Sequence, residues 1–81
     1  MKMPRNVGGE QLARLLTKYG YSTTRQTGSH LRLTSTVKGP EHHITIPRHM
    51  PLKVGTLSAI LKDVAAYLKV EAQQLVEEMF Q

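Results

Sequence analysis

The sequence predicts an α+β domain of the order α-β-β-β-α, in which helices cover one face of a three-stranded antiparallel sheet. Apolar residues recur at helical spacing in two stretches, one beginning near residue 12 and one near residue 57. Between these stretches, two segments alternate apolar and polar residues with the period of two that indicates half-buried strands. The chain has 81 residues, so we expect one domain, 1–81, with a small core.

The first helix is predicted over residues 10–19. Leu12, Leu15, Leu16 and Tyr19 follow the i, i+3, i+4, i+7 spacing and lie on one helical face. Gly20 comes next and can adopt the left-handed conformation that ends many helices. Residues 1–8 are expected to form a loose lead-in.

Three strands follow the first helix. Residues 21–27 are rich in Tyr and Thr, which favour strands, and residues 28–29 (Gly-Ser) make a turn. The second strand is predicted over residues 30–36 and the third over residues 42–47, with a Lys-Gly-Pro turn at residues 38–40. Pro47 and Pro51 then bracket a loop that is unsuited to a central strand.

The alternation assigns the strand residues to the two faces of the sheet. The residues expected to point inward, toward the helices, are Leu31, Leu33, Ile44 and Ile46. The residues expected to point outward are His30, Arg32, His43 and Thr45. The opposite register would bury a histidine and an arginine and expose four aliphatic side chains, so we reject it. The sequence therefore predicts an open sheet face that carries two histidines and an arginine.

A second helix is predicted to begin at Gly55-Thr56 and to run to Leu68. A break near Lys69-Val70 separates it from a terminal helical extension within residues 70–81, where apolar residues again recur at helical spacing. Helices on one face of the sheet would leave the other face to solvent.

The charge is uneven along the chain. The formal net charge is +5, from eleven Lys and Arg and six Asp and Glu. Residues 1–53 hold nine of the basic residues and only two acidic ones. This distribution favours a surface that binds a polyanion and is built from the first two thirds of the chain, although such a charge also occurs on proteins that only need solubility.

The lack of cysteine and of long apolar runs excludes several classes of protein. The chain has no cysteine, which excludes disulfides, thiolate metal sites and thiol nucleophiles. No apolar run reaches the ~20 residues of a transmembrane helix, and no apolar region of a signal peptide follows the basic N-terminal residues. We expect a soluble cytoplasmic protein without contact to a membrane.

His30 is the main candidate for a catalytic residue. It follows Gly28 and Ser29, where the absence of a side chain at Gly28 permits close approach of a phosphate or ribose. Arg25 lies across the turn and Arg32 lies two residues along the same face, and an arginine binds a phosphate with two parallel hydrogen bonds. An imidazole among phosphate-binding groups suits metal-free RNA cleavage, because RNA carries its own nucleophile, the 2′-hydroxyl. This chemistry requires no cofactor.

Weaker candidates lie beyond this segment. Arg48, His49 and Lys53 in and after the proline loop, and His43 on the open face, are expected either to contact RNA or to lie in water. A zinc site formed by His30, His43 and His49 is a less favoured alternative, because only Glu41 offers a carboxylate in that stretch. The sequence has no glycine-rich phosphate loop, no Ser-His-Asp order and no paired carboxylates.

The chain resembles the HicA (YcfA-like) family of toxins from about Gly9 to Leu68. The segments that carry the resemblance are Gly20-Tyr21, Arg25, Gly28-Ser29-His30, Ile46-Pro47-Arg48-His49, Gly55-Thr56-Leu57 and Ile60-Leu61-Lys62. One departure is Lys69, which stands where many relatives have a glycine between the second helix and the extension.

The resemblance implies a fold like that of the double-stranded-RNA-binding domain and an mRNA interferase whose essential histidine is His30. It also implies a HicB-like antitoxin partner that covers the active face, as part of a toxin–antitoxin hetero-oligomer. Two alternatives remain open from the sequence: a non-catalytic RNA-binding module of the same fold, and a domain whose positive charge binds an acidic protein. A metal-dependent hydrolase is a more distant alternative.

Overall fold

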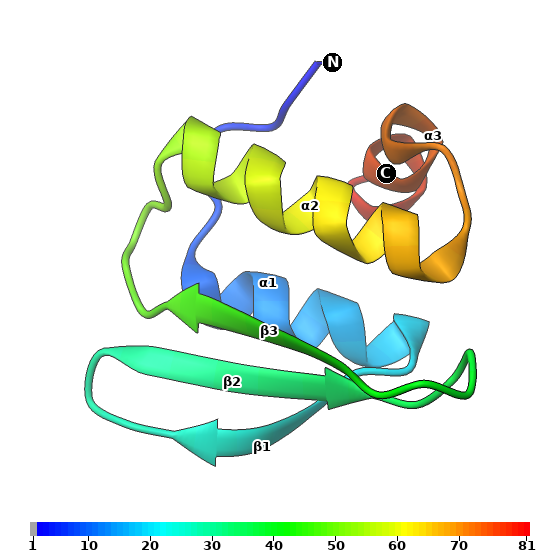
Figure 1. Cartoon of the computed structure of the whole chain (residues 1–81). Helices are drawn as coiled ribbons and strands as arrows, with labels where there is room; N and C mark the ends of the chain where they lie inside the picture. Colours follow the sequence, from blue (N-terminus) through cyan, green and yellow to red (C-terminus); the bar gives the residue numbers. More distant parts are fainter. Residues whose placement is uncertain (1) are drawn as a thin grey trace.

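The computed structural model describes residues 2–81 and has the predicted α+β order, including a helix in the terminal extension (Figure 1). Its elements are α1 (Gly9–Leu16), the 3₁₀ helix η1 (Thr17–Tyr19), β1 (Ser22–Gln26), β2 (His30–Ser35), β3 (His42–Pro47), α2 (Val54–Leu68) and α3 (Ala72–Met79). The strands form one antiparallel sheet in the order β1-β2-β3.

All three helices lie on the same side of the sheet. In Figure 1, α1 and α2 run along that side and α3 packs beside the C-terminal half of α2. The core fills the space between them, and its most completely buried side chains are Leu12, Leu16, Leu33, Ile46, Leu57, Leu61 and Val64. No helix in residues 2–81 has the length and apolarity needed to cross a bilayer.

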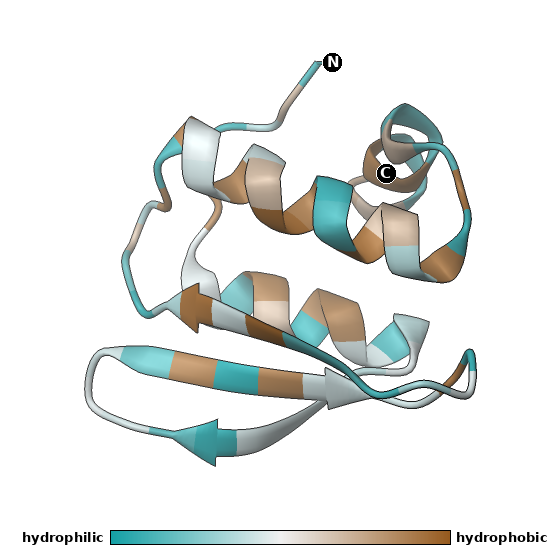
Figure 2. Ribbon diagram, in the orientation of Figure 1, coloured by the Kyte–Doolittle hydropathy of each residue, from teal (hydrophilic) through white to brown (hydrophobic). Residues whose placement is uncertain are grey.

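The register of β2 and β3 confirms the predicted assignment of faces. Leu31 pairs with Ile46 and Leu33 with Ile44, and all four side chains are buried. The pairs on the other face are His30 with Pro47, Arg32 with Thr45 and Thr34 with His43. Figure 2 shows the resulting alternation of hydrophobic and hydrophilic residues along β2.

The ends of α1 differ from the prediction in two ways. The α-helix ends at Leu16 and continues as the 3₁₀ turn η1, after which Gly20 adopts the left-handed conformation with φ of 94°. The N-terminal segment is not uniformly loose, because Val7 is 4% exposed and its carbonyl accepts a hydrogen bond of 2.7 Å from the amide of Leu52. A single buried valine forms no recurring apolar pattern, so its burial could not be predicted from the sequence.

The predicted break between α2 and α3 lies at Lys69. This residue has a left-handed backbone, with φ of 60°, and its amide donates to carbonyls in the last turn of α2. A left-handed residue at this position ends the helix and turns the chain. The terminal extension then forms α3, which buries Leu75, Val76 and Met79.

A polar cluster that the sequence did not predict lies on the helix side of the sheet. Tyr21 is 2% exposed, and its hydroxyl lies 2.5 Å from Nδ1 of His42, whose Nε2 lies 3.1 Å from a carboxylate oxygen of Asp63. The ring of Tyr67 stacks on His42 with centroids 4.6 Å apart. Burial raises the pKa of Tyr21 to about 12, so this hydroxyl stays protonated at neutral pH. The cluster ties β3 to α2 and holds His42 away from the open face.

Candidate functional site

His30 lies where the turn after β1 enters β2, on the open face of the sheet. It is exposed and lines a shallow recess of about 460 Å³. The other residues that line this recess are Arg25, Thr27, Ser29, Arg32 and Thr45. The structure therefore brings four predicted site residues together on one surface, which we call the His30 recess.

The Ser29 side chain holds the His30 ring. Its hydroxyl oxygen lies 2.8 Å from Nδ1 of His30. When Nδ1 donates this hydrogen bond to the hydroxyl oxygen, Nε2 of the neutral ring is unprotonated and can act as a base, whereas Nε2 of the imidazolium carries a proton and can act as an acid. Ser29 thus orients the ring and leaves Nε2 as the nitrogen available for proton transfer.

Thr27 fixes the backbone of the turn. Its side-chain oxygen accepts hydrogen bonds from the amides of His30 at 3.0 Å and of Ser29 at 3.3 Å. Its own amide donates to the carbonyl of His30 at 2.9 Å. Thr27 is not among the residues predicted for the site, although a threonine just before Gly-Ser is a known signal for a side-chain-stabilised turn.

Arg25 and Arg32 supply the positive charge of the recess. They are paired across β1 and β2, and both are exposed. Among the residues that the structure describes, neither guanidinium forms an ion pair with a carboxylate. Two adjacent guanidinium groups without a carboxylate partner are suited to binding the phosphates of a polyanion.

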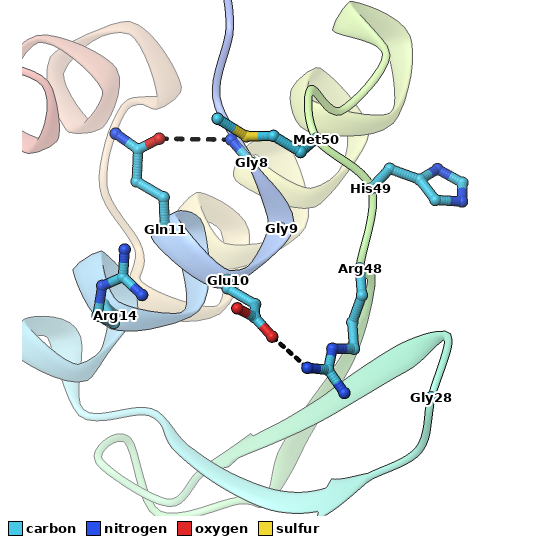
Figure 3. Close-up of a pocket in the computed structure, with 9 residues that line it drawn as sticks. All are labelled: Gly8, Gly9, Glu10, Gln11, Arg14, Gly28, Arg48, His49 and Met50. Atoms are coloured by element: carbon cyan, nitrogen blue, oxygen red, sulfur yellow. Dashed lines mark hydrogen bonds and ion pairs between the residues drawn. The ribbon is translucent and has the colours of Figure 1, made fainter.

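Arg48 does not line the His30 recess. It points to the helix side, where its guanidinium forms an ion pair with Glu10 (Figure 3). The guanidinium also donates a 2.8 Å hydrogen bond to the carbonyl of Thr27. These contacts occupy the group that would bind RNA.

Three further predicted residues lie outside the His30 recess. His43 is on the open face, but its Nδ1 lies 2.8 Å from the Thr34 hydroxyl and its Nε2 lies 2.9 Å from a Glu41 oxygen. Lys53 is exposed at the residue before α2. His49 is exposed and lines a second recess of about 470 Å³, together with Gly28 and Arg48.

Gly28 forms the outer part of the turn. A Cβ atom added there would have no neighbouring atom within 4 Å, and the backbone does not have the positive φ that requires glycine. The folded chain therefore gives no steric reason for a glycine at this position.

Residues 2–81 contain no cluster of three or more His, Cys, Asp or Glu side chains that could hold a metal ion. The three histidines that were weighed for zinc do not form such a cluster.

Comparison with known families supports one assignment. The model of the family described as the HicA toxin of bacterial toxin–antitoxin matches residues 9–65, a span that runs from α1 to within α2 and contains the whole His30 recess. Comparisons with curated proteins and with solved structures gave no significant match.

Proposed function

The chain belongs to the HicA toxin family of bacterial toxin–antitoxin systems, and from this premise we propose that it is an endoribonuclease that cleaves messenger RNA without a metal ion. Cleavage of messenger RNA in the cytoplasm would inhibit translation. The observation that carries the proposal is the His30 recess, where an oriented imidazole lies beside two guanidinium groups that have no carboxylate partner within residues 2–81.

The proposed reaction uses the 2′-hydroxyl of the substrate as the nucleophile. A bond forms between the 2′-oxygen and the adjacent phosphorus, and the bond from phosphorus to the 5′-oxygen breaks. Nε2 of His30 either accepts the proton of the 2′-hydroxyl or donates a proton to the departing 5′-oxygen, and water exchanges the other proton. Arg25 and Arg32 bind the phosphate and stabilise the charge that develops on it. The products are a 2′,3′-cyclic phosphate and a 5′-hydroxyl.

We propose that a HicB-like antitoxin is the protein partner and that it covers the open sheet face in a toxin–antitoxin hetero-oligomer. The family premise supports the pairing with an antitoxin. The exposure of the His30 recess supports the face, because a protein bound there would exclude RNA from the imidazole.

The test uses a labelled single-stranded RNA and a copy in which every 2′-hydroxyl is methylated, both in EDTA. We expect the purified protein to bind both and to cut only the unmodified RNA, because methylation removes the nucleophile. Binding without cutting of either would favour the non-catalytic RNA-binding module. Equal cutting of both would exclude attack by the 2′-hydroxyl.

Arg25 and Arg32 are expected to contribute to the salt dependence of RNA binding. Each of Arg25→Gln and Arg32→Gln should weaken RNA binding and reduce the slope of log affinity against log salt by about 0.7, the value for one phosphate contact on a single strand. The matched control is Lys62→Gln, an exposed residue of α2 on the helix side, which should leave the slope unchanged. Slopes that change equally in all three variants would contradict a specific role for the recess.

The Gly28→Ala variant tests whether RNA approaches the turn closely, because it should affect RNA binding without affecting the stability of the fold. The added methyl group has open space around it in the free protein, so the free energy of unfolding should change by less than about 0.5 kcal/mol. If the RNA backbone passes close to the turn, the same methyl group should raise KM for RNA cleavage severalfold. An unchanged KM would show that RNA does not approach Gly28 closely.

A further inference from the structure

The Arg48 guanidinium connects three parts of the chain that are distant in sequence. It forms an ion pair with Glu10 in the first turn of α1 and donates a 2.8 Å hydrogen bond to the carbonyl of Thr27 in the turn before β2. Its own backbone amide donates to the carbonyl of Ser29 at 2.9 Å. Figure 3 shows the side chain reaching from the end of β3 toward α1, with Gly28 at the outer part of the turn.

These contacts define a role that differs from phosphate binding. The Arg48 side chain is 27% exposed, so it is partly withdrawn from solvent. Two of the three guanidinium nitrogens, Nη1 and Nη2, already donate to the Thr27 carbonyl and to Glu10, which leaves fewer donors for a phosphate. The structure therefore separates Arg48 from Arg25 and Arg32, which have no ion-pair partner among residues 2–81.

Thr27 links Arg48 to His30 through hydrogen bonds. The Thr27 amide donates a hydrogen bond to the His30 carbonyl, and the Thr27 side-chain oxygen accepts hydrogen bonds from the amides of Ser29 and His30. Ser29 in turn contacts Nδ1 of the His30 ring. The links from Arg48 through Thr27 and Ser29 to His30 are all direct hydrogen bonds. Gly28, at the outer end of the turn, has no side chain that could stabilise the turn.

We propose that Arg48 and Glu10 form a positioning pair that holds the turn before His30 against α1 and thereby sets the orientation of the His30 ring. This inference rests on the proposed function for its consequence in catalysis. Its structural part concerns the turn alone and is measurable without RNA.

The experiment compares Arg48→Gln, Arg48→Lys and Glu10→Gln with the parent protein. The matched control is Arg14→Gln, because Arg14 is an exposed arginine of α1 that lines the same 470 Å³ recess. The first measurement is hydrogen exchange at the Ser29 and His30 amides in the absence of RNA. Loss of the guanidinium contacts should accelerate this exchange by roughly ten- to a hundredfold in Arg48→Gln, the effect of losing one hydrogen bond to a charged group, and should leave Arg14→Gln unchanged.

The second measurement divides the kinetic effect between kcat and KM. A positioning pair predicts that Arg48→Gln lowers kcat about tenfold, with KM and the salt slope unchanged, because the phosphate ligands remain. Arg48→Lys should not restore kcat, since an ammonium group cannot reach both acceptors with the geometry of the fork. Glu10→Gln keeps a hydrogen-bond acceptor and should show a smaller decrease.

Two results would overturn the proposal. Amide exchange at Ser29 and His30 that is unchanged in Arg48→Gln would show that the pair does not hold the turn. A raised KM and a reduced salt slope with kcat unchanged would show that Arg48 binds RNA directly. If the parent protein does not cut RNA at all, the proposed function fails, and the exchange measurement still decides whether the pair holds the turn.

Discussion

Replacing His30 by alanine is expected to lower the rate of RNA cleavage at saturating protein by roughly 10²- to 10⁴-fold, the contribution of a general acid or base. The reason is that Nε2 of His30 is the proton-transfer group of the recess, held in place by Ser29 through Nδ1. RNA affinity should change by less than about threefold, because the guanidinium groups of Arg25 and Arg32 remain. The measurement is single-turnover cleavage of a labelled RNA, with affinity determined separately.

A second histidine on the same face provides the control for this variant. His43 lies at the opposite end of the open face, and contacts to Thr34 and Glu41 occupy both of its ring nitrogens. His43→Ala should therefore keep the saturating cleavage rate within about threefold of the parent, whatever it does to affinity. A His30→Ala protein that is folded and cuts as fast as the parent would exclude His30 from the chemistry.

Replacing Gly9 by alanine is expected to lower the free energy of unfolding by roughly 3 kcal/mol, the upper end of the usual cost of overpacking. A Cβ atom at this position would lie 2.0 Å from the carbonyl oxygen of Pro47, which is backbone and cannot rotate away. The amide of Gly9 also donates a 2.9 Å hydrogen bond to the carbonyl of His49, so a shift of α1 would break this link to the proline loop. For a domain of this size, such a loss is a large fraction of the total stability.

The chain offers a matched control for this second variant. Gly55 also lies in the first turn of a helix, but a Cβ atom there would have no neighbouring atom within 4 Å. Gly55→Ala should leave the stability unchanged or raise it by up to about 1 kcal/mol, because alanine favours the helix. Urea unfolding of the two variants measures both effects. Equal stability of Gly9→Ala and the parent would show that α1 and the end of β3 are not as close as the structure has them.

The sequence predicts the faces of β2 and β3 well because burial there is regular. The four aliphatic residues Leu31, Leu33, Ile44 and Ile46 alternate with polar ones, and only one register buries all of them. The break at Lys69 was also predicted, and apolar residues recur at helical spacing on both sides of it, in α2 and in α3. These are local patterns, and they place His30 and Arg32 on the open face.

Contacts between distant segments were not predictable from such patterns. All five residues of β1 are exposed and the pairing with β2 shifts between Thr23 and Arg25, so no alternation could show which face Arg25 occupies. The partner of Arg48 is Glu10, on another element, and their contact depends on how α1 packs against the end of β3. Sequence reasoning therefore gave Arg48 as a residue that contacts phosphate or lies in water, and it could not predict the contacts to Glu10 and Thr27.

The central claim, that this protein cleaves RNA through the 2′-hydroxyl without a metal ion, is tested most directly by the chemical ends of the products. The measurement is a single-turnover reaction of the parent protein with a single-stranded RNA in EDTA, followed by identification of both new ends. The account predicts a 2′,3′-cyclic phosphate on one fragment and a 5′-hydroxyl on the other. Fragments with a 5′-phosphate and a 3′-hydroxyl, or cleavage that appears only when a divalent metal ion is added, would contradict it.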